Sequence, residues 1–137
     1  KGYHADMTRT VLVGSITDRH KEIYNIVLES QLAGISAAKS GVKCSELDKI
    51  CRDVIDNHGY GELFMHSTGH GLGLEVHTLP RITWLNHNQL KENNVITIEP
   101  GIYIADWGGV RIEDDCVIKK DNCVPMNNST KELVILD

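Results

Sequence analysis

The sequence predicts an α+β protein in which two helices cover one side of a mostly antiparallel sheet. One segment of β-branched residues comes first, two helical patterns follow it, and short strand patterns separated by turn residues fill the remainder. The 137 residues suffice for one domain, and a hydrophobic content of 41% is enough for a packed core. No repeat, low-complexity segment or internal linker interrupts this order.

The first strand is expected at residues 7–13, which are rich in β-branched side chains and end at a Gly-Ser pair. A long helix should follow, capped by Thr17 or Asp18 and ending near Lys39. Apolar residues recur there at steps of three and four, as on one face of a helix. Gly34 weakens this helix locally.

A second helix is expected to open at Ser45, with Asp48 in the position of the acidic member of a capping box. Its apolar stripe consists of Leu47, Ile50, Cys51, Val54 and Ile55. Gly59 stands where a left-handed C-terminal cap is expected. We interpret both helices as covers for the sheet.

The rest of the chain predicts loops and short strands. Residues 78–93 should be irregular, because Pro80 and several asparagines are loop signals. Turns are expected at a Pro-Gly, a Gly-Gly and an Asp-Asn pair. The expected strands are residues 95–98, 102–104, 110–118 and 133–136.

Composition argues against several classes of partner. The net charge of −5 and the absence of a lysine or arginine cluster argue against nucleic-acid binding. No apolar run approaches the roughly 18 residues of a membrane-spanning helix, and no signal-peptide pattern opens the chain. None of the four cysteines belongs to a C-x-x-C pair, so we expect reduced structural thiols and a cytoplasmic location.

The stretch HSTGHGLGLEVH at residues 66–77 concentrates three of the seven histidines of the chain. His66 and His70 have the i, i+4 spacing of a helical ligand pair, but the glycines around them favour a loop or short strand. A lone histidine is usually a core or surface residue. Three of them beside acidic residues on strands make a metal site an equal alternative.

Two acidic residues on strand patterns are the first candidate partners. Glu99 ends an apolar strand just before Pro100, so it either meets a cation or lies in water. Glu113 follows Arg111 with the period of a strand, so Arg111 could orient a neighbouring carboxylate, unless the strand is simply exposed. Asp6 by itself carries no signal. One imidazole with several carboxylates suits Mn²⁺, with Zn²⁺, Co²⁺ or Fe²⁺ as alternatives.

Four segments together resemble a known family. They are DMTRT (6–10), the histidine stretch (66–77), TIEPGIY (97–103) and GVRIEDD (109–115). They occur in the order found in the metallopeptidases with the pita-bread fold, closest to the Xaa-Pro aminopeptidases and Xaa-Pro dipeptidases (prolidases). Methionine aminopeptidases share the fold but differ in two of these segments, and rank second. No G-x-S-x-G, P-loop, H-E-x-x-H or nucleotide fingerprint competes.

The resemblance implies a site with two divalent metal ions, most readily manganese, with cobalt, zinc or iron as alternatives. Asp6 matches an aspartate that bridges the two ions, and Glu113 matches a bridging glutamate. His70 matches the single histidine ligand. Glu99 matches a metal-binding glutamate that also handles protons.

The resemblance also implies the catalytic groups and the substrate. His66 and His77 match histidines that line the substrate site and stabilise the reacting carbonyl and its tetrahedral intermediate, and Arg111 matches an arginine behind the metal ligands. The implied reaction is hydrolysis of short peptides with proline at the second position by a metal-activated hydroxide. Creatinase-like hydrolysis without metal and a non-catalytic peptide-binding module are alternatives, and the retained metal-ligand types favour the enzyme.

In the family, a further aspartate ligand and a histidine lie upstream of the segment that matches DMTRT. Residues 1–137 are therefore expected to be the C-terminal part of a catalytic domain, mainly the second half of the pita-bread fold. Its first partner would be the N-terminal part of the same protein, and a homodimer is common among relatives. The isolated fragment is expected to bind metal weakly and to hydrolyse little.

Overall fold

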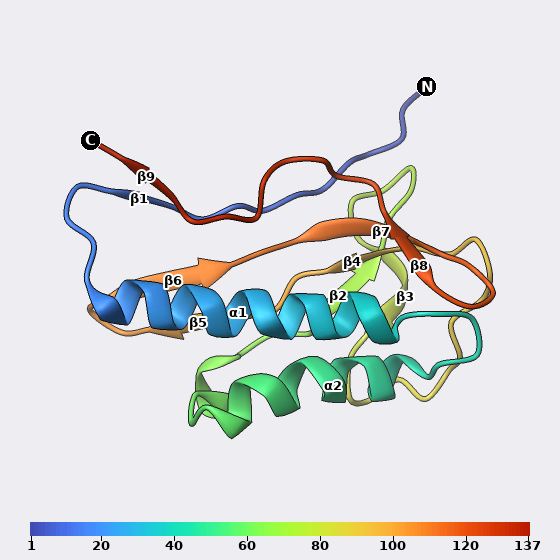
Figure 1. Ribbon diagram of the computed structural model, residues 1–137. Helices are drawn as coiled ribbons and strands as arrows, with labels where there is room; N and C mark the ends of the chain where they lie inside the picture. Colours follow the sequence, from blue (N-terminus) through green and yellow to red (C-terminus); the bar gives the residue numbers. More distant parts are fainter.

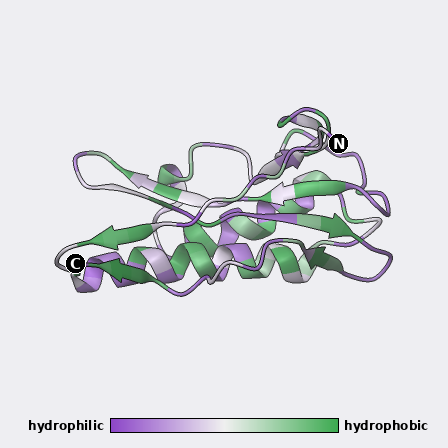
Figure 2. Ribbon diagram, turned by 90° about the horizontal axis from the view of Figure 1, so that it is seen from above, coloured by the Kyte–Doolittle hydropathy of each residue, from purple (hydrophilic) through white to green (hydrophobic).

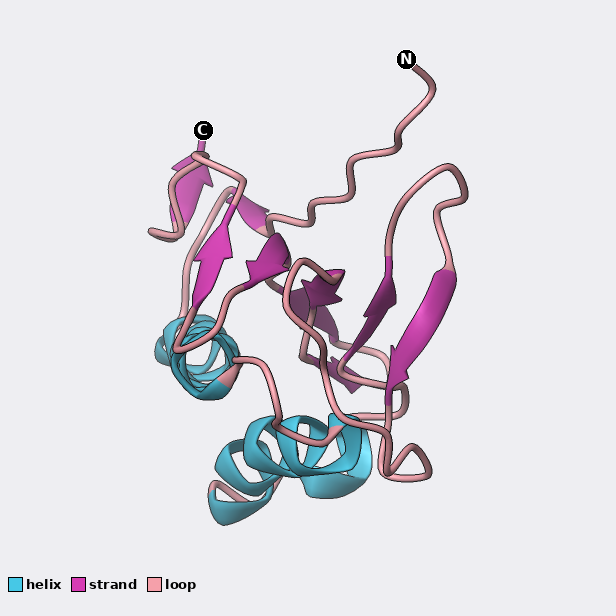
Figure 3. Cartoon of the chain, turned by 90° about the vertical axis from the view of Figure 1, so that its right-hand side faces the viewer, coloured by secondary structure: helices cyan, strands magenta, loops and turns pink.

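The computed structural model describes residues 1–137 and places two helices beneath several short strands (Figures 1 and 3). The prediction of two helices covering a mostly antiparallel sheet is confirmed. Neither helix is long and apolar enough to cross a membrane. In chain order the elements are β1 (Val11–Val13), α1 (Asp18–Ala37), α2 (Cys44–Asn57), the 3₁₀ turn η1 (Gly61–Leu63), β2 (Gly69–Gly71), β3 (Thr78–Ile82), β4 (Val95–Ile98), β5 (Gly101–Ile104), β6 (Gly108–Arg111), β7 (Asp114–Ile118), β8 (Cys123–Pro125) and β9 (Val134–Leu136).

The strands form one larger sheet and two small ones. The larger sheet has the order β3-β2-β4-β7-β8 and is antiparallel throughout. The strands β5 and β6 form an antiparallel pair, and β1 pairs in parallel with β9, so that segments near the beginning and the end of the chain run side by side (Figure 1). The segment before β1 also touches the turn before β7, where the Glu113 amide donates to the Thr8 carbonyl at 3.1 Å.

The helices begin and end close to the expected residues, with one correction. Thr17 precedes α1 as predicted, and Gly59, at φ +82°, follows the end of α2. The expected capping box of Ser45 and Asp48 is wrong, because α2 begins one residue earlier, where the Cys44 amide donates to a carbonyl of the 83–90 loop at 3.0 Å. The side chain of Asp48 is instead fully buried.

Two strand predictions are wrong for reasons of sheet topology. Residues 78–82 are not irregular but form β3, where Pro80 is tolerated because β3 is an edge strand of its sheet. The single strand expected at residues 110–118 is divided into β6 and β7, because β6 pairs with β5 and β7 pairs with β4. The chain changes sheets between them, at Ile112 and Glu113. The strand β8 was not predicted.

The core lies between the helices and the larger sheet. Hydrophobic and hydrophilic residues alternate along α1, as expected for a helix with one buried face (Figure 2). In α2, Leu47, Cys51 and Ile55 of the predicted stripe are fully buried. All four cysteines are buried and unpaired, as expected of structural thiols.

A glycine lies where α1 approaches both α2 and β4. A Cβ atom on Gly34 would be 2.6 Å from Cys51 Sγ and 3.0 Å from Ile98 Cγ2. Forcing a methyl group into this contact should cost about 1–3 kcal/mol, more than the roughly 1 kcal/mol that alanine contributes through helix propensity.

We therefore expect Gly34→Ala to lower the free energy of unfolding, measured by urea denaturation. Ser36→Ala, on the exposed face of the same helix, is the matched control and should change it by less than about 0.5 kcal/mol. A Gly34→Ala protein more stable than the wild type would contradict the close packing of the two helices.

Candidate metal centre

His70 is the middle residue of β2, between β3 and β4. Glycines flank it because neighbouring backbone comes too close for any side chain. A Cβ atom on Gly69 would lie 2.0 Å from the Thr97 carbonyl oxygen, and one on Gly71 would lie 2.2 Å from the Leu79 carbonyl oxygen. The Gly-His-Gly sequence thus lets β2 enter the sheet with one imidazole as its only side chain.

Acidic side chains converge on this imidazole from three other segments. Asp6 comes from the segment before β1, Glu99 from the end of β4, and Glu113 from the connection between β6 and β7. Ligand atoms of Asp6, His70 and Glu113 lie within 4.8 Å of one another. Glu99 approaches the same imidazole, with Oε1 3.1 Å from His70 Nε2. The structure therefore brings together the four residues proposed as metal ligands.

His70 and Glu99 lie within hydrogen-bond distance of each other. His70 Nδ1 donates to the Gly71 carbonyl at 3.0 Å, so Nε2 is the atom that faces the carboxylates. Burial alone would lower the pKa of His70, but the hydrogen bond to Glu99 and the charges of Glu99 and Asp6 raise it above the usual value. Burial would raise the pKa of Glu99, yet hydrogen bonds from His70 and Thr97 keep it below its usual range.

Glu113 lacks a cationic partner of this kind. Its side chain is buried, with a residue exposure of 2%. Burial, together with the charges of Glu99 and Asp6, raises the pKa of Glu113 to about 7, even though the Thr8 hydroxyl donates to its Oε2 atom. The site thus contains three carboxylates and one imidazole, and negative charge exceeds positive charge. Such a group of side chains fits a divalent cation that accepts oxygen and nitrogen ligands.

Arg111 reaches Glu113 through another residue. The expectation that both share one face of a strand is wrong, because β6 ends at Arg111. Instead Arg111 Nε donates to Thr8 Oγ1 at 3.0 Å, and Thr8 donates to Glu113. Thr8 lies within the DMTRT segment, but nothing in the sequence signals that it connects these two side chains.

The two other histidines of the stretch have different surroundings. His77 is exposed, and its ring centroid lies 4.3 Å from that of His70. His66 is half-buried, and both of its ring nitrogens have partners: Nδ1 lies 2.9 Å from the Ser67 carbonyl oxygen and Nε2 lies 2.8 Å from the Tyr103 hydroxyl. Tyr103 was not among the predicted site residues, although it closes the TIEPGIY segment.

A buried ion pair fixes the segment that carries Asp6. Arg9 Nη2 is 2.7 Å from Asp114 Oδ1, and Arg9 Nη1 donates to the Glu113 carbonyl at 2.6 Å. Burial would raise the pKa of Asp114, but hydrogen bonds from Lys131 and Arg9 hold it below the usual range. Opposite charges so far apart in the sequence give no signal that they pair.

Known proteins resemble the chain in sequence and structure. Residues 1–120 match metallopeptidase family M24. The Xaa-Pro dipeptidase of Pyrococcus horikoshii is 50% identical over 132 residues, covering 96% of this chain and 38% of that protein. An Xaa-Pro dipeptidase structure from Bacillus anthracis has a TM-score of 0.97 and 49% identity, over 98% of this chain and 38% of that one. The structure of the X-Pro aminopeptidase from Thermotoga maritima MSB8 has a TM-score of 0.96 and 44% identity, over 98% of this chain and 38% of that one.

These similarities confirm the resemblance inferred from the four sequence segments, and with it the second half of the pita-bread fold. The chain spans about 38% of the length of these relatives.

The site predicts a metal affinity that depends on pH. A divalent ion must displace the proton of Glu113, whose pKa is about 7. As the pH falls below about 7, Glu113 becomes protonated, so we expect the affinity for Mn²⁺ to drop roughly tenfold per pH unit. The raised pKa of His70 acts in the same direction, because a protonated imidazole cannot bind a metal ion.

Isothermal titration of Mn²⁺ into the full-length protein, in buffers of different ionisation enthalpy, measures both affinity and proton release. The Glu113→Gln protein should bind more weakly and release one proton fewer. An affinity that does not change between about pH 5.5 and 7 would contradict the assignment of Glu113.

Proposed function

Because the chain belongs to metallopeptidase family M24, we propose that residues 1–137 are the C-terminal part of the catalytic domain of a longer metal-dependent exopeptidase. Its substrates are Xaa-Pro dipeptides, as the names of similar proteins from Pyrococcus horikoshii and Bacillus anthracis suggest. The observation that carries the proposal is the convergence of Asp6, His70 and Glu113 on one point, with Glu99 beside it.

Asp6, His70, Glu99 and Glu113 would hold two divalent ions, with manganese as the first choice because the donor set is rich in oxygen. When bound, such ions make a water molecule acidic enough to attack a peptide carbonyl near neutral pH. Arg111 and Thr8 keep Glu113 in position, since Thr8 donates to Glu113 and accepts a hydrogen bond from Arg111 at 3.0 Å.

Glu99 is the residue suited to move the proton. Hydrogen bonds from Thr97 and His70 favour its ionised form, so it can accept a proton from the attacking water and deliver it to the departing amine. In an Xaa-Pro substrate that amine is the secondary nitrogen of proline. The contact with the imidazole of His70 keeps the Glu99 carboxylate close to the other proposed metal ligands.

The exposed ring of His77 is free to donate a hydrogen bond to the reacting carbonyl oxygen, next to His70. His66 has partners for both ring nitrogens. Its contribution to the same oxygen requires its ring to exchange the Tyr103 hydroxyl for the substrate. His66 and Tyr103 therefore act as a pair.

We also propose a cytoplasmic location. The support is chemical: four buried cysteines are all free, and buried thiols persist unpaired in reducing compartments. The upstream part of the same protein is proposed as the partner that completes the site, because similar proteins are more than twice as long as this chain.

Removing a proposed ligand should abolish activity without unfolding the protein. In the full-length protein we expect Glu99→Ala and His70→Ala to lower kcat for Gly-Pro by at least about a hundredfold in the presence of Mn²⁺. Glu92→Ala and His87→Ala, at exposed positions, are the matched controls and should retain full activity. Melting temperatures within a few degrees of the wild type show that the fold is intact. Near-normal turnover by either ligand variant would refute the site.

The choice of substrate separates the alternatives. We expect hydrolysis of Gly-Pro, and slower or no hydrolysis of Gly-Ala and Met-Ala. Cleavage of longer Xaa-Pro peptides at a similar rate would favour an X-Pro aminopeptidase, the activity named for one of the similar structures. Preferential cleavage of Met-Ala would favour a methionine aminopeptidase. If the metal-loaded full-length protein hydrolyses none of these peptides, the proposed peptidase activity is wrong and a non-catalytic peptide-binding module is the alternative that remains.

A further inference from the structure

An ion pair within α2 directs its remaining hydrogen bonds to one segment of the histidine stretch. Arg52 Nε lies 2.8 Å from Asp48 Oδ2, and the Asp48 side chain is fully buried. Asp48 Oδ1 accepts the Thr68 amide at 2.9 Å. Arg52 Nη1 donates to the Phe64 carbonyl at 2.8 Å, and Nη2 donates to the His66 carbonyl.

These three contacts are with alternate residues of one short segment, 64–68. Residues 64–68 lie between η1 and β2 and belong to no helix or strand. The side chains of Arg52 and Asp48 therefore supply hydrogen-bond partners for their backbone at three points. This arrangement fixes the backbone on both sides of His66 and leaves the imidazole facing the site, where it meets Tyr103 at 2.8 Å.

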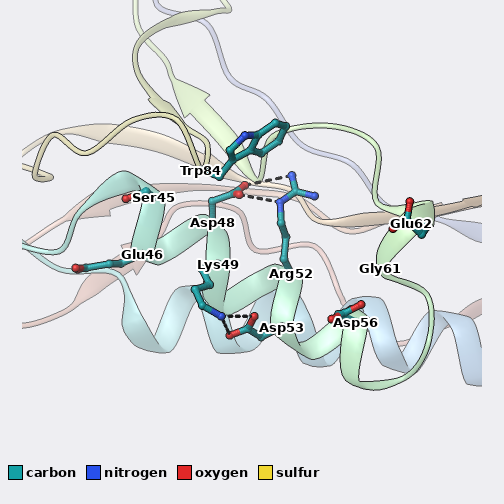
Figure 4. A pocket seen from close by; sticks show the side chains of 10 residues that line it. All are labelled: Ser45, Glu46, Asp48, Lys49, Arg52, Asp53, Asp56, Gly61, Glu62 and Trp84. Carbon is teal, nitrogen blue, oxygen red and sulfur yellow. Dashed lines mark hydrogen bonds and ion pairs between the residues drawn. The ribbon is translucent and has the colours of Figure 1, made fainter.

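The guanidinium group is also held between two aromatic rings. Arg52 Cζ lies 4.3 Å from the centroid of Phe64 and 4.8 Å from that of Trp84. Figure 4 shows Arg52, Asp48 and Trp84 close together. All three line an open pocket of about 540 Å³. A planar cation with several donors can stack and donate in this way, whereas a lysine can replace only its charge.

Stability of α2 does not explain this arrangement. Burying a carboxylate and a guanidinium is costly unless further hydrogen bonds satisfy both groups, and here those bonds all go to residues 64–68. One turn away, Lys49 and Asp53 form a pair with the same i, i+4 spacing at 2.6 Å, but it is exposed and touches no other segment. The same helix thus contains a matched pair without the contacts to the loop.

We propose that Arg52, with Asp48, is a positioning residue that holds His66 in the geometry required for catalysis. Asp48 holds the other side of the same segment, since its Oδ1 atom accepts the Thr68 amide. The expected effect of Arg52 on the reaction rate rests on the proposed function. The expected effect of Arg52 on the position of the His66 ring does not depend on any activity.

A double-mutant cycle in the full-length, Mn²⁺-loaded protein tests the proposal. Arg52→Lys keeps the charge next to Asp48 but cannot make both carbonyl contacts, so kcat for Gly-Pro should fall between about tenfold and a hundredfold with little change in KM. In the His66→Ala protein the same substitution should cost less than about threefold, because the residue that it positions is gone. Lys49→Ala, which breaks the exposed pair, should leave kcat unchanged. An equal loss with and without His66 overturns the proposal.

Nuclear magnetic resonance of the histidine rings supplies a readout without activity. The ring signals of His66, assigned by their loss in His66→Ala, should shift in Arg52→Lys and not in Lys49→Ala. Trp84→Leu, which removes one stacking ring at an exposed position, should shift them in the same direction and serves if Arg52→Lys does not fold. Unchanged His66 signals in both variants overturn the proposal. A wild-type protein that does not hydrolyse Gly-Pro while these signals shift refutes the proposed function alone.

Discussion

The buried carboxylate of Asp114 joins three segments that are far apart in the sequence. It is completely enclosed and is held by Arg9 at 2.7 Å, by Gln31 at 3.0 Å and by Lys131. These partners come from the segment before β1, from α1 and from the segment before β9. Removing both cations would leave an unpaired charge in the interior, at a cost of several kcal/mol. The ion pair of Arg9 with Asp114 also holds the segment before β1 against β7, where the Asp6 amide donates to Asp115 at 3.0 Å.

The next residue toward the N-terminus has the opposite environment. Glu113 is buried among other carboxylates, and its pKa is raised to about 7, whereas hydrogen bonds from Lys131 and Arg9 keep the pKa of Asp114 below its usual range. Two adjacent acidic residues thus differ in whether the fold places a cationic side chain in direct contact with them. Where it does, the carboxylate is structural; where it does not, the carboxylate remains available for an ion from solution. Their surroundings differ because Glu113 lies in the connection between the two sheets, whereas Asp114 is the first residue of β7.

Much of this could be predicted from the sequence, because periodicity and local turn chemistry act over a few residues. Both helices and the cap at Gly59 follow from such signals. The four proposed ligands were identified because each lies in a segment with a family resemblance. The link from Arg111 through Thr8 to Glu113 could not be predicted, since it joins remote segments whose pairing is decided by tertiary packing. The same holds for β3, where position at a sheet edge overrides the loop signal of Pro80, and for Asp48, whose helical spacing suggested a cap.

We propose that Asp6, His70, Glu99 and Glu113 are ligands of divalent metal ions. The most direct measurement is anomalous X-ray diffraction from crystals of the full-length protein grown with Mn²⁺. We expect strong anomalous density within coordination distance of all four side chains, with His70 contacting an ion through Nε2, because its Nδ1 donates to Gly71. Anomalous density only elsewhere in the protein, with the hydrogen bond between His70 and Glu99 still in place, would contradict it.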